Sequence, residues 1–160
     1  MPRVGIGYDS HRFTTSRPMV LGGLQLDCGF GLAGHSDADA VLHAVTDAVL
    51  GAMGGPDIGE LFPDTDPRWK DADSSVFLRA ALERAAQANL AVVNCDVTVI
   101  AEQPKLSPHK QPMRRRLAEL LGIDPSRVSV KAKTNEGMGW IGRGEGLAVI
   151  AAVLLDERTA

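Results

Sequence analysis

Aromatic residues are scarce in this chain of 160 residues, of which Phe, Tyr and Trp together make up only 4%. The hydrophobic core must therefore be built mainly from alanine, valine, leucine and isoleucine. An excess of basic residues is also absent, because 17 Lys and Arg face 20 Asp and Glu, giving a formal net charge of -3. Nucleic-acid phosphates require a basic surface, so we expect no nucleic-acid partner. The three arginines at 114–116 fit a solvated helix face.

The two cysteines, Cys28 and Cys95, lie far apart and match no zinc-binding or redox spacing, which indicates thiols in a reducing compartment. No apolar signal-peptide segment follows the N-terminus. The longest apolar stretch, Leu147–Leu155, is far shorter than the roughly 20 residues of a membrane helix. We therefore expect a cytoplasmic protein without a membrane partner. A plastid stromal location is expected only if a transit peptide has been removed.

Length and hydrophobic periodicity predict one domain, 1–160, of α+β or mixed α/β class. The order of elements favours a small mixed β-sheet with helices on one face, and the other face is left to be covered in an oligomer. The third helix begins at Ser107, with Pro108 at its first helical position, or else at Pro112. The expected strands are 3–8, 19–21, 92–102, 128–133 and 147–155, and the expected helices are 36–50, 74–89 and 107–121.

Asp9, His11 and His43 are candidate ligands of one divalent metal ion. Asp9 and His11 stand two residues apart on an extended segment, so their side chains share a face. His43 lies within a helical pattern but off its apolar stripe, so we do not expect it in the core. One carboxylate and two imidazoles form a three-ligand set, which in zinc proteins usually marks a site left open to a substrate.

Two other polar segments allow two interpretations each. Ser36 and Asp39 fit a helix capping pattern, and the free amides of a helix start also bind phosphate, here about 10 Å from His43. The carboxylate-rich loop 57–66 is either a solvated turn or a pocket for a polyol; its spacing is not that of an EF-hand. The segment 142–146 fits a tight turn with an internal Arg143–Glu145 pair. Walker A, dinucleotide-binding and serine hydrolase motifs are missing.

Taken together in their order along the chain, five segments resemble the 2-C-methyl-D-erythritol 2,4-cyclodiphosphate synthase family of the non-mevalonate isoprenoid pathway. They span nearly the whole chain, and the ordered set is highly specific. The segments are Gly-Tyr-Asp-Ser-His (7–11), Gly-His-Ser-Asp-Ala-Asp (34–39) with His43, Asp-Ile-Gly-Glu-Leu-Phe-Pro-Asp-Thr-Asp (57–66), Lys-Ala-Lys-Thr-Asn-Glu (131–136) and Gly-Arg-Gly-Glu-Gly (142–146).

The resemblance implies a homotrimer that packs its sheets around a three-fold axis, with active sites between subunits. It implies a lyase that converts 4-diphosphocytidyl-2-C-methyl-D-erythritol 2-phosphate to the cyclic diphosphate and releases CMP. The 2-phosphate of the substrate is the nucleophile, so no protein nucleophile is needed. It also implies Zn2+ or another divalent transition metal on Asp9, His11 and His43. Mg2+ or Mn2+ is implied beside the substrate diphosphate, held by Glu136.

The resemblance further implies roles for single residues. His35 and Thr134 match the positions that stabilise the transition state, and Arg143 matches an arginine facing an axial cavity that can hold an isoprenoid diphosphate. Lys133 and Trp140 depart from the threonine and phenylalanine of many members, which concerns fine specificity. The implied substrate-binding residues are Asp9, Ser10, His11, His35, Ser36, Asp57, Ile58, Gly59, Phe62, Pro63, Asp64, Thr65, Asp66, Ala101, Glu102, Gln103, Pro104, Lys105, Leu106, Ser107, Lys133, Thr134, Asn135, Glu136, Trp140 and Arg143. Among these, 101–107 and 133–136 are the segments implied to contact the cytidine nucleotide and its phosphates.

Two alternatives compete with this interpretation. The same three ligands suit a zinc-dependent phosphoesterase, in which bound water is the nucleophile and is consumed. The second alternative is a trimeric module without catalytic activity that binds a nucleotide or a prenyl phosphate. Product analysis separates them, because cyclisation releases CMP without consuming water.

Overall fold

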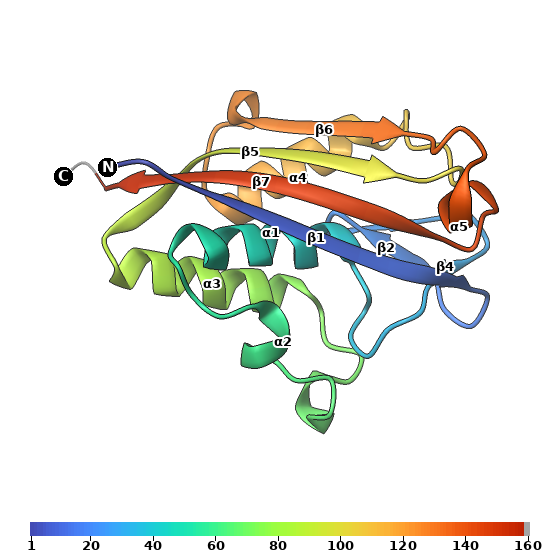
Figure 1. The fold of residues 1–160 in the computed structure, drawn as a ribbon, viewed down its shortest axis with the longest axis horizontal. Coiled ribbons are helices and arrows are strands. Elements are labelled where there is room, and N and C mark those ends of the chain that lie inside the picture. The colour runs from blue at the N-terminus through green and yellow to red at the C-terminus, as the bar shows by residue number, and fades with distance from the viewer. Residues whose placement is uncertain (159–160) are drawn as a thin grey trace.

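The computed structural model describes residues 1–158, which form a five-stranded sheet in the order β4-β1-β7-β5-β6 (Figure 1). β5 and β6 are parallel and the other neighbouring strands are antiparallel, so the predicted mixed sheet is confirmed. A separate hairpin of β2 and β3 connects β1 to β4. The strands are β1 (Arg3–Thr14), β2 (Met19–Leu21), β3 (Leu24–Leu26), β4 (Gly31–Leu32), β5 (Leu90–Ile100), β6 (Val128–Lys133) and β7 (Gly146–Glu157).

Three long helices cover one face of this sheet, as predicted (Figure 1). α1 packs on β1 and β7, α3 packs on α1 and β5, and α4 packs on β6. Within the described part of the chain, no helix has the length and apolar character needed to cross a membrane. The helices are α1 (Ala40–Ala52), α2 (Ile58–Leu61), α3 (Ser75–Gln87), α4 (Lys110–Leu121) and α5 (Gly139–Gly142), with 3-10 turns η1 (Pro67–Trp69) and η2 (Pro125–Arg127).

The two faces of the sheet differ because side chains alternate along a strand. On the helical face, β7 contributes a fully buried series that includes Leu147, Val149 and Val153. On the opposite face, Val4 and Ile6 of β1 are 68% and 70% exposed. Tyr8 and Ile150 extend this open apolar surface. A single chain therefore leaves one face of its sheet uncovered.

Two helix starts differ from their prediction. α1 begins at Ala40 with Asp39 as its N-cap, not at Ser36, because Ala38 has φ +59° and the chain is not helical there. The Ser36 hydroxyl accepts the N–H of Ala38 instead. α4 begins at Lys110, since residues 107–109 form a turn, and Pro112 is tolerated in the first helical turn, where its missing N–H has no intrahelical partner.

Candidate metal centre and adjoining cavity

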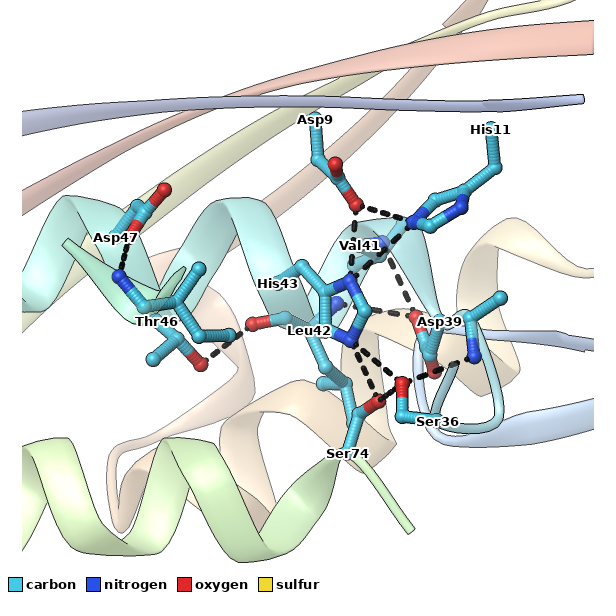
Figure 2. A network of polar contacts seen from close by, with 12 residues as sticks. Asp9, His11, Ser36, Asp39, Val41, Leu42, His43, Thr46, Asp47 and Ser74 are labelled. Carbon is cyan, nitrogen blue, oxygen red and sulfur yellow. Dashed lines mark hydrogen bonds and ion pairs between the residues drawn. The ribbon is translucent and has the colours of Figure 1, made fainter. Parts of the chain in front are cut away.

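Three side chains converge on one point between β1 and α1 (Figure 2). Oδ2 of Asp9 lies 2.9 Å from Nε2 of His11 and 3.0 Å from Nδ1 of His43. The two ring nitrogens are 3.4 Å apart. The structure therefore assembles the predicted group of one carboxylate and two imidazoles, which has the composition to hold a metal ion.

The strand and the helix place these groups through their different periodicities. Asp9 and His11 occupy alternate positions of β1 that face α1, whereas Tyr8, the residue before Asp9, points to the open face. His43 lies in the first turn of α1, where its N–H bonds to the carbonyl of Asp39 at 3.0 Å. Its apolar helix neighbours are buried and its own side chain is 13% exposed, so the predicted position off the core stripe is confirmed. Asp39, one helical turn before His43, is fully buried because it is the N-cap of α1.

The outer partner of His11 determines which ring nitrogen faces the centre. Nδ1 of His11 lies 2.7 Å from the carbonyl oxygen of Ala33. A carbonyl only accepts hydrogen bonds, so Nδ1 carries a proton, and in the neutral imidazole Nε2 then presents a lone pair to the Asp9 carboxylate. Nε2 of His11 and Oδ2 of Asp9 are 2.9 Å apart. At this distance the lone pair and the carboxylate repel each other unless a cation lies between them.

The electrostatics of the centre agree with this need for positive charge. Burial acts to raise the pKa of the Asp9 carboxyl, but hydrogen bonds with His11 and His43 outweigh it and lower that pKa to about 2. Burial acts to lower the pKa of the His11 imidazole, but its bond to Asp9 and the charge of that carboxylate raise the pKa above its usual value. The carboxylate is therefore anionic at neutral pH and attracts a proton or a metal ion.

The spacing of the donor atoms suits a transition metal. Zinc bound at about 2.0–2.1 Å by tetrahedral ligands places its donor atoms about 3.3 Å apart. The three observed separations run from 2.9 to 3.4 Å. His11 and His43 also line the adjoining cavity, so a fourth position can face a ligand there.

This cavity has a volume of about 250 Å³ and combines polar with aromatic walls. Phe62 packs against Phe77 with ring centroids 4.8 Å apart, and against Trp69 edge to face at 5.2 Å. Trp69 and Phe77 were not predicted; the available signal was that three of the few aromatic residues fall between 62 and 77. The cavity is lined by His11, Gly34, His35, Ser36, His43, Ile58, Gly59, Phe62, Asp64, Trp69 and Phe77.

The carboxylate-rich loop contributes to this cavity only in part. Ile58, Gly59, Phe62 and Asp64 line it, whereas other acidic groups of the loop stabilise local turns. Oδ1 of Asp57 accepts the N–H of Glu60 at 2.9 Å and caps α2. The Asp66 side chain likewise caps η1 and pairs with Arg68, and its carbonyl lies 2.9 Å from Nε2 of His35. Substrate contacts of the loop residues, those lining the cavity included, stay predictions.

The helix start is not the anion site that the capping pattern allowed. Asp39 itself occupies the first amides of α1, since Oδ1 accepts the N–H groups of Val41 and Leu42 at 3.1 and 3.0 Å. Its two oxygens also accept the N–H groups of Gly22 and Gly23. His43 is one turn, not two, from the helix start. His35 and Ser36 nevertheless line the cavity, so the loop before the helix still faces it.

The two segments predicted to contact the nucleotide lie side by side. They leave the ends of the parallel strands β5 and β6, where the N–H of Ala101 bonds to the carbonyl of Lys133 at 2.9 Å. Oε1 of Glu102 accepts the N–H of Asn135 at 2.9 Å and that of Gly137 at 3.1 Å. The structure therefore joins 101–107 and 133–136 into one region of the surface.

Within one chain, residues 133–136 lie across the sheet from the metal ligands. The pairing registers place Asp9, Val149, Val99 and Ala132 in one row across β1, β7, β5 and β6. Three strand spacings of about 4.8 Å separate the ends of this row by about 14 Å. Residues 133–136 follow Ala132 on β6, an edge strand that lies three strands away from β1.

Ser10, Trp140 and Arg143 lie apart from that cavity as well. Ser10 and Trp140 line a second hollow together with His11, Arg12 and Glu145. Nε of Arg143 bonds to Oε1 of Glu145 at 2.7 Å, so the predicted internal pair is present.

A family model matches residues 2–156, nearly the whole chain, and is described as the YgbB family. The chain belongs to the YgbB family. A relative from Gemmatimonas aurantiaca, named 2-C-methyl-D-erythritol 2,4-cyclodiphosphate synthase, is 58% identical over 96% of this chain and 92% of its own length. Another protein of that name, from Neisseria gonorrhoeae, is 56% identical over 96% of both chains.

Solved structures of this family share the fold closely. The bifunctional IspDF from Campylobacter jejuni superposes with a TM-score of 0.95 at 42% identity, over 99% of this chain and 43% of the longer one. A CDP complex of IspF from Plasmodium falciparum gives a TM-score of 0.87 at 34% identity, covering 99% of this chain and 97% of that one. The family fold expected from the sequence is therefore confirmed.

Proposed function

We propose that this chain converts 4-diphosphocytidyl-2-C-methyl-D-erythritol 2-phosphate to 2-C-methyl-D-erythritol 2,4-cyclodiphosphate and releases CMP. The observation that carries the proposal is an assembled Asp9–His11–His43 group in a chain 58% identical, nearly end to end, to a protein named as that synthase. The comparisons give no support to a phosphoesterase. A module without catalytic activity is disfavoured, because all three ligand atoms are in place.

The reaction needs little more than positioning and charge neutralisation. An oxygen of the 2-phosphate attacks the β-phosphorus of the diphosphate, and the bond to the CMP oxygen breaks. Both reacting groups are anionic, so the protein must bring like charges together and hold them in line. Zn2+ bound to Asp9, His11 and His43 would polarise phosphoryl oxygens and offset negative charge.

The groups around the cavity support distinct parts of this task. His35 and Ser36 line the cavity beside the metal ligands, where they can contact a phosphate of the substrate. The aromatic walls of Phe62, Trp69 and Phe77 suit the carbon skeleton of methylerythritol and exclude water from it. In the nucleotide region, Thr134 donates a hydrogen bond to Glu136 at 3.0 Å. Glu136 is our candidate for holding Mg2+ or Mn2+ beside the diphosphate, and Thr134 for stabilising the transition state.

We further propose that the active enzyme is a homotrimer with shared sites. The apolar surface of Val4, Ile6, Tyr8 and Ile150 needs a cover, and three sheets around an axis provide it. The separation of about 14 Å along the row from Asp9 to Ala132 supports a nucleotide region supplied by a neighbour. Arg143, 64% exposed in its side chain, is our candidate for an axial contact with an isoprenoid diphosphate.

The deciding experiment is incubation with the cytidine substrate, Zn2+ and Mg2+, followed by phosphorus NMR in ¹⁸O-labelled water. We expect CMP and a cyclic diphosphate without ¹⁸O in either product. Incorporation of ¹⁸O into a released phosphate would establish the phosphoesterase instead. The His43→Ala variant should lose both the zinc ion and turnover while remaining folded, because this side chain lies off the apolar stripe of α1.

A further inference from the structure

The side of His43 that faces away from the metal centre contacts a buried serine from a distant segment. Nε2 of His43 lies 2.8 Å from Oγ of Ser74, the residue immediately before α3 (Figure 2). Ser74 is fully buried. Asp37 binds this serine twice, since its carboxylate accepts the Ser74 hydroxyl and, at Oδ2, the Ser74 N–H at 3.0 Å. The contacts form a chain from carboxylate to hydroxyl to imidazole.

The proton positions along this chain follow from which groups can donate. The Asp37 carboxylate only accepts, so the single hydroxyl proton of Ser74 points to Asp37. Oγ of Ser74 then presents a lone pair to His43, and Nε2 must carry the imidazole proton. Nδ1 is left with its lone pair directed at the point shared with Asp9.

A second serine near the ring agrees with this assignment. Oγ of Ser36 lies 3.1 Å from Nε2 of His43 and accepts the N–H of Ala38. Its own proton has an acceptor in Oγ of Ser74 at 3.4 Å. If the Ser36 proton instead pointed at Nε2, two lone pairs would face each other across the 2.8 Å between His43 and Ser74. The network is consistent only with the proton on Nε2.

We propose that Asp37 and Ser74 are positioning residues that hold His43 in the Nε2-protonated tautomer and aim Nδ1 at the metal ion. The inference rests on the proposed metal site. The Ala33 carbonyl orients His11 in a similar way, because it holds the proton on Nδ1 and leaves Nε2 directed at the metal ion. Such outer partners of histidine ligands fix the orientation of the ring and typically change metal affinity about 10–100-fold when removed.

Ser74→Ala is the test variant and Ser75→Ala its matched control. Ser75 is the next residue and is also buried, but its N–H and side chain face Asp73 instead of His43. Zn2+ affinity, measured by competition with a chromogenic chelator, should fall about 10–100-fold in Ser74→Ala and stay unchanged in Ser75→Ala. Ser74→Thr keeps the hydroxyl and should recover most of the affinity. Equal affinity in wild type, Ser74→Ala and Ser75→Ala would overturn the proposal.

A second readout needs no turnover, and its main measurement uses the wild-type protein alone. In the zinc-loaded wild-type protein with ¹⁵N-labelled histidine, long-range ¹H–¹⁵N spectra should show the proton of His43 on Nε2. Exchange of that proton with water should quicken in Ser74→Ala. A proton on Nδ1 would overturn the tautomer assignment. Absence of cyclic diphosphate from wild-type reactions would overturn only the proposed reaction, since both readouts here measure metal binding and protonation.

Discussion

Gly7 of β1 lies so close to the main chain of Ala44 in α1 that a Cβ on Gly7 would overlap the carbonyl oxygen of Ala44. Gly5 has the same relation to Ala48, one helical turn further on. The two glycines therefore let α1 rest directly on the strand. This close approach brings His43, beside Ala44, within hydrogen-bonding distance of Asp9, two residues after Gly7.

Gly7→Ala should destabilise the fold and weaken the metal centre together. The added methyl group meets backbone atoms, which cannot move aside as a side chain can, so we expect a loss of about 1–3 kcal/mol or more in the free energy of unfolding. Urea unfolding and zinc titration measure the two effects. Gly51→Ala is the control, because the nearest atom outside α1 in the described chain, Ile6 O, would lie 4.0 Å from the new Cβ, and the change should stabilise α1 by about 0.5–1 kcal/mol. Normal stability of Gly7→Ala would contradict the close packing.

The metal ligands were predictable because their geometry is local. A period of two places Asp9 and His11 on one face, and the helical pattern places His43 off the apolar stripe. Ser74 was not predictable, because no spacing relates it to His43; the contact depends on how the start of α3 packs on the loop before α1. The wrong start of α1 has a similar origin. Ser36 and Asp39 both fit a cap, and only the left-handed Ala38 decides between them.

Subunit mixing tests the shared site. Asp9→Ala and Glu136→Ala should each be inactive alone, and mixing with subunit exchange should restore part of the activity. Recovery is expected because some sites in a mixed trimer then combine an intact metal centre with an intact nucleotide region from a neighbour. The measurement is CMP release after exchange, with native mass spectrometry to confirm mixed trimers.

The matched control combines Asp9→Ala with His43→Ala, two ligands of one centre in one chain. Every site in that mixture lacks a ligand, so no activity should return. If the Asp9→Ala and Glu136→Ala mixture also stays inactive although exchange has occurred, both halves of the site belong to the same chain.

The two cysteines should differ sharply in reactivity. Cys95 is buried in β5, and desolvation, with the nearby charge of Asp96, raises the pKa of its thiol to about 12 from the usual 9.0. Cys28 is partly exposed. Because the thiolate is the nucleophile, iodoacetamide at mildly alkaline pH should label Cys28 and leave Cys95 unmodified until the protein is unfolded. Mass spectrometry of the peptides measures this, and equal labelling of both would contradict the buried position.

The raised pKa of the Cys95 thiol also predicts how the stability of the protein changes with pH. The unfolded thiol ionises near pH 9.0, whereas the folded thiol stays neutral to about pH 12. The contribution of Cys95 to stability is therefore fully present below pH 9 and is lost as the pH rises toward 12. Cys95→Ala should lose stability less steeply in this range than the wild type, measured by urea unfolding at several pH values.

Glu102 should act by holding the turn that carries Thr134 and Glu136. Its Oε1 accepts the N–H groups of Asn135 and Gly137, which flank Glu136 in a left-handed conformation with φ +52°. Such a conformation persists in a residue other than glycine only when its surroundings maintain it. In Glu102→Ala we expect kcat/KM for the cytidine substrate to fall about tenfold, or about 1.4 kcal/mol, at unchanged zinc content. The zinc ligands lie across the sheet and should not be affected.

Glu102→Gln separates this positioning role from a direct one. The glutamine side chain keeps a carbonyl oxygen with two lone pairs, enough to accept both N–H groups, but it carries no charge. If Glu102 serves the turn, Glu102→Gln should retain most of the activity that Glu102→Ala loses. If both variants lose activity equally, the negative charge itself is required, and Glu102 then acts on a divalent ion or on the substrate. Steady-state kinetics over a series of Mg2+ concentrations distinguish the two cases, because only the loss of a contact with the ion raises the Mg2+ concentration needed for half-maximal rate.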